Sequence, residues 1–164
     1  MKIGNVVSLF GGMECGRLAL NKIATSIGDY FSSEIDKFAR KEVAANFPEV
    51  IQIGDVTKWR EWDIDWSRIH LLMGGSPCQV FSLAGEQGGT KAELNGEIII
   101  VANRETYLEV KEAGAKFLSQ SHLFWEFVLC LDFVKEKNPR VKFMLENVVM
   151  TKKQPRYDNQ RSWR

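Results

Sequence analysis

The sequence has few of the residues that hold metal ions or form disulfide frameworks. Its 164 residues include three cysteines and two histidines. Cys15, Cys78 and Cys130 are far apart, and no Cys-x-x-Cys pair exists. Zinc sites and disulfide scaffolds are recognised by paired or regularly spaced cysteines, so neither is indicated. We therefore expect no metal.

Long apolar runs are also missing. No run approaches the length of about 18 apolar residues that a membrane-spanning helix needs, so we expect no membrane partner. Residues 1–7 lack the apolar length and the small-residue cleavage site of a secretory signal, which makes a cytoplasmic protein the default. The dinucleotide-binding pattern Gly-x-Gly-x-x-Gly is absent too, which disfavours a nicotinamide-dependent dehydrogenase.

What is present is typical of one globular domain with a sizeable core. Hydrophobic residues make up 45% of the chain and charged residues 26%, both ordinary values. The net charge of +1 is unevenly spread, because residues 135–164 hold nine Lys or Arg against three acids. A basic end suits a polyanionic partner, although a solvated surface tail has the same composition.

The pattern of apolar residues predicts strands alternating with helices. The predicted strands cover residues 2–10, 30–34, 50–54, 69–73 and 141–145. The predicted helices cover residues 13–24, 36–46, 58–66, 105–116 and 122–137. Residues 84–121 interrupt this order and read as an insertion, with an extra strand at 96–101. The alternation predicts an α/β fold with a doubly wound, mostly parallel sheet.

Every predicted strand ends in a residue suited to binding or chemistry. These residues are Gly12, Glu34, Asp55, Cys78 and Glu146. In a parallel α/β sheet the carboxyl ends of the strands meet at one edge, where ligands bind. Gly74, Gly75 and Pro77 break the fourth strand just before Cys78, which exposes and orients its thiol as a nucleophile requires. The convergence predicts a cofactor beside a nucleophile.

Each of these residues has a simpler interpretation when it is taken alone. Gly11 and Gly12 fit a plain structural turn, and Cys78 fits a small buried thiol. Glu34 lies close to Asp36 at the start of a predicted helix, where acids are favoured. We interpret the three tryptophans of residues 59–66 and Cys130 as core residues, and His122 as a helix-capping or surface group.

At these strand ends the sequence resembles the cytosine-C5 DNA methyltransferases, most of all their mammalian de novo branch and related phage enzymes. The matching segments are Ser8-Leu9-Phe10-Gly11-Gly12, Glu34, Gly54-Asp55-Val56, Gly74-Gly75-Ser76-Pro77-Cys78-Gln79 and Leu145-Glu146-Asn147-Val148. Motifs of this kind in the same order are specific. The resemblance implies a Rossmann-like methyltransferase core that uses S-adenosyl-L-methionine.

The resemblance also implies residue roles. The cofactor-binding residues would be Phe10, Gly12, Glu34, Ile35, Asp55, Val56, Pro77 and Leu123. The catalytic residues would be Cys78 and Glu146, and Ser76, Gln79 and Asn147 would bind the substrate. Cys78 would add to C6 of a cytosine flipped out of double-stranded DNA, while Glu146 would hydrogen-bond N3 and the exocyclic amine.

The resemblance covers residues 5–150, which is the N-terminal half of such an enzyme. We expect a catalytic core over residues 1–150, with its insertion at about 84–121, and a basic tail over 151–164. The target-recognition region and the C-terminal motif have no counterpart, so the expectation is a C-terminally truncated or split form. A complementary subunit is then a candidate partner. The first motif also departs from the family pattern at Glu14-Cys15.

Two alternatives to this function stay open. One is an inactive fragment that binds the cofactor or a partner, and the other is a tRNA cytosine-C5 methyltransferase. Because the motif sequences resemble those of phage enzymes, we expect the protein in the cytoplasm of a bacterial or phage-infected cell. The resemblance also implies a restriction-modification context.

Overall fold

The structure is a computed structural model that describes residues 2–24, 26–77 and 90–147. The chain forms two compact units. The first comprises Met1–Ser76 and Glu126–Glu146, and the second comprises Pro77–Trp125 and Asn147–Arg164.

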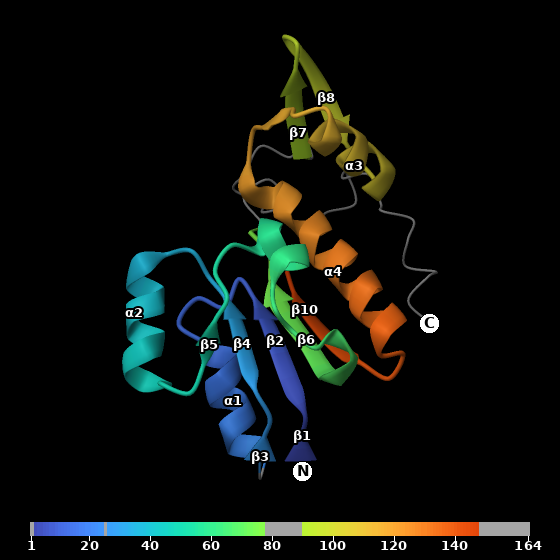
Figure 1. Cartoon of the computed structure of the whole chain (residues 1–164). Coiled ribbons are helices and arrows are strands. Elements are labelled where there is room, and N and C mark those ends of the chain that lie inside the picture. The colour runs from blue at the N-terminus through green and yellow to red at the C-terminus, as the bar shows by residue number, and fades with distance from the viewer. Residues whose placement is uncertain (1, 25, 78–89, 148–164) are drawn as a thin grey trace. The chain divides into compact units, whose positions relative to one another are not determined.

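The first unit is built on a five-stranded parallel sheet (Figure 1). Its strands are β2 (Asn5–Leu9), β4 (Tyr30–Ser33), β5 (Ile51–Gln52), β6 (Ile69–Gly75) and β10 (Lys142–Glu146). They lie in the order β10-β6-β2-β4-β5, and every neighbouring pair is parallel. The chain starts at the central β2, moves outward to β5, and then returns to β6 and β10. This is the predicted doubly wound fold, whose direction switches between β2 and β6.

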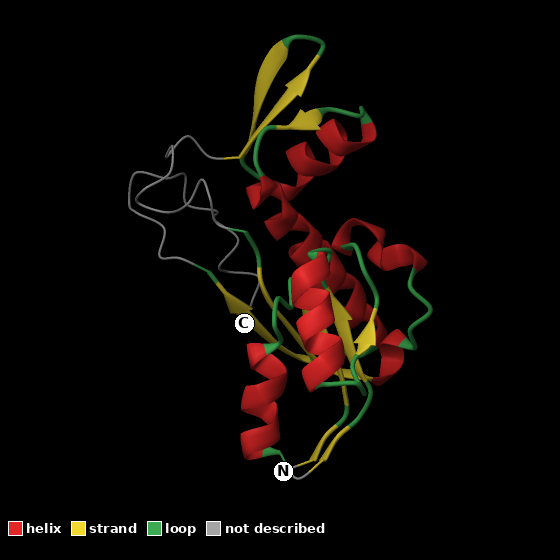
Figure 2. Cartoon of the chain, turned by 90° about the vertical axis from the view of Figure 1, so that its left-hand side faces the viewer, coloured by secondary structure: helices red, strands yellow, loops and turns green. Residues whose placement is uncertain are grey.

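Helices cover both faces of the sheet. The helices are α1 (Cys15–Ile23), α2 (Lys37–Asn46) and α4 (Leu123–Lys137). Val6 on one face clusters with Leu20 of α1 and Val43 of α2. Phe127 of α4 approaches Gly74 on the other face, because successive strand residues point to opposite sides. The turned view in Figure 2 shows these layers, with helices in red and strands in yellow.

The second unit contains a three-stranded antiparallel sheet in the order β8-β7-β9. Its elements are β7 (Thr90–Leu94), β8 (Glu97–Val101), α3 (Arg104–Glu112), β9 (Lys116–Phe117) and the 3-10 turn η3 (Gln120–His122). Asn95 and Gly96 join β7 to β8 with φ angles of 52° and 85°. Asn-Gly is the preferred pair for such a two-residue hairpin turn. The sequence reading identified β8 and α3 but missed β7.

Residues 58–66 do not form the predicted helix. They form two 3-10 turns, η1 (Val56–Glu61) and η2 (Trp66–Arg68), which begin where Asp55 and Asp65 accept hydrogen bonds from backbone N–H groups. Trp59 is buried as expected, whereas Trp62 and Trp66 are half-buried and stack on each other. The tryptophan spacing therefore predicted a packed face correctly. The type of helix that it predicted was wrong.

Two smaller expectations also differ from the structure. The strand predicted over residues 2–10 is divided, because β1 (Lys2–Ile3) pairs with β3 (Ser26–Ile27) and only β2 enters the main sheet. The spacing of Phe38, Ala39 and Val43 predicts that these residues form the inner side of α2, but the side chain of Phe38 is 68% exposed.

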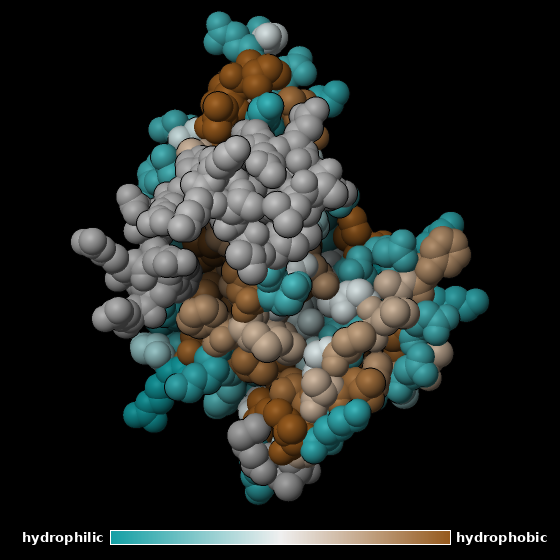
Figure 3. Space-filling model, turned by 180° about the vertical axis from the view of Figure 1, so that it is seen from behind, coloured by the Kyte–Doolittle hydropathy of each residue, from teal (hydrophilic) through white to brown (hydrophobic). Residues whose placement is uncertain are grey.

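The surface of the described residues is mixed in polarity. Met13, just before α1, and Leu18 and Ile23 within α1 are exposed, and the rear view in Figure 3 shows apolar side chains among hydrophilic ones. No helix among the described residues is both long enough and apolar enough to cross a membrane.

Candidate functional site

The site begins at the turn between β2 and α1, which has an unusual backbone. Phe10, Gly12 and Glu14 have positive φ angles of 58°, 55° and 60°. Side-chain-bearing residues adopt this region at an energetic cost, and such positions cluster at functional sites. The N–H of Glu14 donates to the carbonyl of Gly11 at 2.9 Å, and the N–H of Gly11 donates to Ser33 of β4 at 3.1 Å. The turn is thereby tied to the carboxyl end of the neighbouring strand.

Glu34 follows β4 and holds the same turn from the other side. Its Oε2 accepts a hydrogen bond from the N–H of Gly12 at 2.9 Å. Its Oε1 accepts from the N–H groups of Ile35 and Asp36 at 2.7 and 2.8 Å. A carboxylate can accept about four hydrogen bonds, so one position on Oε2 is left for a ligand hydroxyl.

Asp36, and not Glu34, is the acid that caps the following helix. The Asp36 carboxylate accepts from the N–H groups of Phe38 and Ala39, both in the first turn of α2. Glu34 therefore stays at the sheet edge. Ile35 beside it is 65% exposed, which leaves an apolar side chain at the surface next to the glycine turn.

Asp55 lies at the next strand end, in a turn attached to β4. The hydroxyl of Ser33 donates to the carbonyl of Gly54 at 2.8 Å, which holds this turn beside β4. Asp55 Oδ1 accepts from the N–H and the hydroxyl of Thr57 at 2.8 and 2.9 Å. Both bonds use Oδ1, so Oδ2 is available to a donor such as an amine. Val56 is buried behind it.

The ends of β6 and β10 meet because glycines leave room. Gly75 pairs with Glu146 in the parallel register. A Cβ on Gly75 would lie 2.9 Å from Oε2 of Glu146, and a Cβ on Gly74 would lie 2.7 Å from the carbonyl oxygen of Leu9. The exposed Glu146 carboxylate therefore lies against the backbone at the end of β6, and Ser76, which follows, is buried.

The remaining predicted site residues are placed less fully. Cys78 and Gln79 lie outside the described residues. Pro77, Leu123 and Asn147 belong to the second unit, and each is half-buried. Among residues 2–24, 26–77 and 90–147, no group of three or more His, Cys, Asp or Glu side chains is arranged to hold a metal ion.

Sequence reasoning missed one functional candidate, the carboxyl group of Glu14. It is fully buried next to the glycine turn. Burial raises its pKa; the hydroxyls of Ser32, Tyr30 and Ser8 partly oppose that shift, and the charge of Glu34 adds to it. The only signal in the sequence was that Glu14 departs from the family's first motif.

Comparison with known proteins adds a family match. A family profile described as C-5 cytosine-specific DNA methylase matches residues 4–103. The chain is similar to the type II methyltransferase M1.ScrFI of Lactococcus lactis subsp. cremoris, with 44% identity over 84 residues, which are 51% of this chain and 21% of that protein. It is also similar to the orphan methyltransferase M.SPBetaI of Bacillus phage SPbeta, with 37% identity over 157 residues, 87% of this chain and 33% of the relative.

The chain spans about a fifth to a third of the length of the curated relatives it matches. Among solved structures, the crystal structure of a Spodoptera frugiperda DNMT2 mutant aligns with a TM-score of 0.48 and 15% sequence identity. That alignment covers 88% of this chain and 35% of the other.

Proposed function

Because the chain belongs to the C-5 cytosine-specific DNA methylase family, we propose that it provides the cofactor site and the nucleophile for methylation of cytosine at C5 in DNA. One observation carries the proposal. The glycine turn, Glu34, Asp55 and Glu146 all follow parallel strands of one sheet and therefore share its carboxyl edge.

The proposed cofactor is S-adenosyl-L-methionine, which supplies an electrophilic methyl group on a sulfonium. The donor set at the edge fits its adenosine part. Glu34 has a remaining acceptor position for a ribose hydroxyl, and Asp55 Oδ2 for the adenine amine. The apolar contacts in this proposal come from Phe10, Ile35, Val56, Pro77 and Leu123, and the backbone of Gly12 allows close approach.

In the proposed reaction the thiolate of Cys78 attacks C6 of the target cytosine. A sulfur–carbon bond would form at C6, and the electron pair of the C5–C6 double bond would form the bond from C5 to the methyl group. The methyl–sulfur bond of the donor would break, and its sulfur would leave as the neutral thioether of S-adenosyl-L-homocysteine. C5 then loses its proton, the C5–C6 double bond forms again, and the sulfur–carbon bond breaks to release the thiolate. Glu146 assists by holding N3 and the exocyclic amine, for which its carboxyl must carry or share a proton.

The proposed substrate is double-stranded DNA, from which the cytosine is flipped into the site. Ser76, Gln79 and Asn147 are the proposed substrate-binding residues, and they neighbour Cys78 or Glu146 in the sequence. Since the curated relatives are several times longer than this chain, we propose that target recognition needs additional polypeptide, such as a complementary subunit.

Trapping with 5-fluorocytosine tests this function. Fluorine at C5 cannot leave as a proton does, so the covalent adduct should persist after methyl transfer. We expect a denaturation-resistant complex between the full chain and duplex DNA containing 5-fluorocytosine in the presence of S-adenosyl-L-methionine. Cys78→Ser should abolish it, whereas Cys15→Ser, which changes an exposed cysteine, should preserve it.

The other outcomes separate the alternatives. Cofactor binding by calorimetry without any adduct would identify an inactive cofactor-binding fragment. An adduct with 5-fluorocytosine-containing tRNA but not with DNA would identify a tRNA methyltransferase. An adduct that survives Cys78→Ser would refute the proposed nucleophile.

A further inference from the structure

Glu14 places a carboxyl group inside the protein, directly beside the glycine turn. Its side chain has no exposed surface. Its backbone belongs to the turn, because its N–H donates to Gly11 at 2.9 Å and its carbonyl accepts from Leu18 of α1 at 3.1 Å. A glutamate is almost never fully buried unless its carboxyl is partnered. The backbone of the turn and its inward-pointing carboxyl therefore form one unit.

The carboxyl connects the turn to β4. The hydroxyl of Tyr30 donates a hydrogen bond to Oε2 of Glu14 at 2.6 Å. Tyr30 is itself buried, and its hydroxyl lies 3.8 Å from the sulfur of Met73 on β6. Oε1 is buried and has no hydrogen-bond partner among the described residues. It lies beneath Gly11, where a Cβ would come within 1.9 Å of it.

No cation forms an ion pair with this carboxyl among the described residues. Arg17 of α1 lies over the ring of Tyr30, 5.6 Å from its centroid, and its guanidinium pairs with Glu49 at 2.8 Å. Glu34, which directly follows β4, is a negative charge that acts on this carboxyl, and it accepts the N–H of Gly12 on the other side of the turn. Ser8 of β2 and Ser32 of β4 add only hydroxyls. An ionised Glu14 would be a second, unpaired negative charge beside Glu34, which is costly inside a protein.

We propose that Glu14 is a positioning residue of the cofactor site, whose buried carboxyl group fastens the glycine turn to Tyr30 and so holds Gly12 in its binding conformation. Its role toward the cofactor rests on the proposed function. Glu14 does not touch the ligand in this proposal. It acts through the turn, which it supports from below, while Glu34 holds Gly12 from the ligand side.

The proposal predicts a pH dependence that a merely structural glutamate would not cause. At low pH the carboxyl is neutral and can remain in its buried position. Once ionised it would be an unpaired buried charge next to Glu34, so it is drawn toward water and the turn moves with it. Burial raises the pKa of Glu14, and above that pKa binding requires the carboxyl to regain its proton. Affinity for S-adenosyl-L-methionine should then fall by up to about tenfold per pH unit. Glu14→Gln keeps the shape and the uncharged state, so its affinity should equal that of the unaltered protein at low pH and lose this dependence.

Calorimetry of the full chain with S-adenosyl-L-methionine, as a function of pH from acid to alkaline buffers, measures this directly. Glu42→Gln removes an exposed carboxylate from α2 and is the matched control, which should keep the original pH profile. Identical profiles for Glu14→Gln and the unaltered protein would overturn the proposal. An affinity that rises with pH only when Glu14 is present would also overturn it, because the carboxylate would then attract the cofactor.

A second measurement needs no cofactor. The amide signal of Gly12 in an NMR titration of the unaltered protein should move with the ionisation of Glu14, and this movement should vanish in Glu14→Gln. Tyr30→Phe, which removes the hydroxyl partner, should shift the midpoint. If Gly12 titrates but no protein binds the cofactor, the proposed function fails and the positioning role stands. If the cofactor binds and Gly12 does not respond to Glu14, the positioning role fails alone.

Discussion

At the residue scale, the sheet edge is shaped by positions that tolerate no side chain. Gly74 lies where β2 and β6 adjoin, and its missing Cβ leaves room for the Leu9 carbonyl, with the Phe127 ring 3.3 Å from the same point. A backbone carbonyl in a central strand cannot move without disturbing the ladder. Gly16 differs, because a Cβ there would meet the flexible end of Met73 at 2.4 Å.

The first prediction compares alanine at these two glycines. Gly74→Ala should lower the free energy of unfolding by about 1–3 kcal/mol, the range found for overpacked sites. Gly16→Ala should cost less, since Met73 can change rotamer and alanine is worth up to about 1 kcal/mol over glycine in a helix. Urea unfolding followed by circular dichroism measures both. Equal losses would contradict the distinction between a backbone and a side-chain obstacle.

The second prediction concerns the cysteines. Cys130 is fully buried in α4, and burial, with a smaller contribution from the charge of Glu126, raises the pKa of its thiol. Cys15 is exposed. Because the thiolate is the reactive form, iodoacetamide should label Cys15 in the native protein and Cys130 only after unfolding.

Mass spectrometry of labelled peptides, before and after addition of urea, provides the measurement. Cys130→Ser is the control, because the label that appears only after unfolding should be absent from this variant. Rapid native labelling of Cys130 would show that α4 opens far more readily than its packing indicates.

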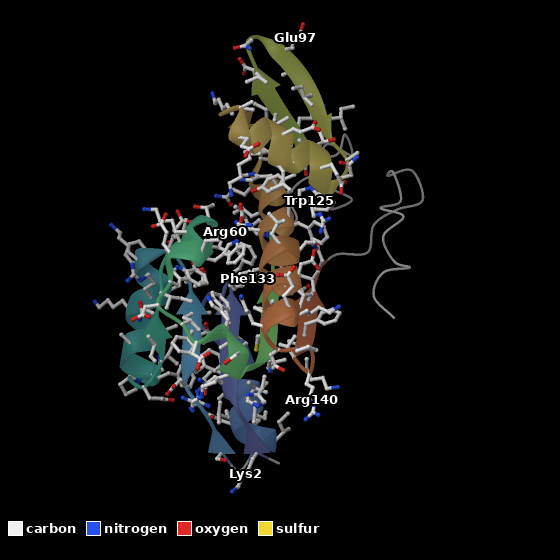
Figure 4. All side chains as sticks on the ribbon, turned by 45° about the vertical axis from the view of Figure 1, so that its right-hand side comes forward. Lys2, Arg60, Glu97, Trp125, Phe133 and Arg140 are labelled. Atoms are coloured by element: carbon white, nitrogen blue, oxygen red, sulfur yellow. The ribbon has the colours of Figure 1, made fainter. Side chains whose placement is uncertain are left out.

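At the element scale, the 3-10 turn η1 occupies part of the segment 58–66, for which a helix was predicted. A buried hydrogen bond attaches η1 to α4. The indole N–H of Trp59 donates to Glu126 at 3.0 Å. Arg60 lies 4.0 Å from the centre of the Trp59 ring, and Phe133 packs against that ring at 5.3 Å between centroids; both residues are labelled in Figure 4. A short turn with few internal hydrogen bonds thus gains its stability from a helix 67 residues further along the chain.

The third prediction follows from that contact. Trp59→Phe keeps an aromatic ring but removes the N–H donor, so Glu126 loses a partner inside the protein. We expect a loss of about 1–3 kcal/mol in the free energy of unfolding. Trp62→Phe, at a half-buried ring that stacks on Trp66, should cost clearly less. Thermal and urea unfolding of both variants would decide, and a larger effect at Trp62 would contradict the importance of the buried bond.

At the scale of the whole molecule, the chain divides into two units with separate cores. The first unit surrounds the parallel sheet, and the second contains the antiparallel sheet with the buried residues Ala92, Val101 and Tyr107. The chain enters and leaves the antiparallel sheet at neighbouring positions, because the N–H of Leu118 donates to the carbonyl of Lys91 at 3.0 Å. The predicted insertion at 84–121 falls within this second unit.

The fourth prediction is that the antiparallel sheet is dispensable for the core. Replacing residues 92–117 by Asn-Gly would join the adjacent Lys91 and Leu118 through a two-residue turn. We expect the shortened chain to keep its cooperative unfolding, because the contacts of the parallel sheet lie within the first unit. Circular dichroism melts and calorimetry with S-adenosyl-L-methionine provide the measurement. Loss of cooperative unfolding would show that the two units fold as one.

Much of the fold could be predicted because its information is local. Runs such as Val6–Leu9 and Ile69–Met73 are mostly apolar and are followed within two residues by glycine, which marks buried parallel strands. The hairpin at Asn95-Gly96 was equally local but was overlooked, since Thr90–Leu94 is short and polar. The turns at 56–68 could not be predicted, because Trp59 is held by Glu126, a residue of a distant helix.

The sequence by itself determined the order of the main strands and helices of the first unit, its doubly wound sheet and the residues near each strand end, because apolar periodicity and chain-breaking residues act over a few positions. Only the tertiary structure decided how those ends are used. In the folded chain the carboxyl of Glu14 points inward and accepts a hydrogen bond from Tyr30. Asp36, and not Glu34, caps α2, and Glu146 lies against Gly75. The physical reason is that hydrogen-bond partners, burial and available space belong to neighbours in space, and strand register brings together residues far apart in the chain.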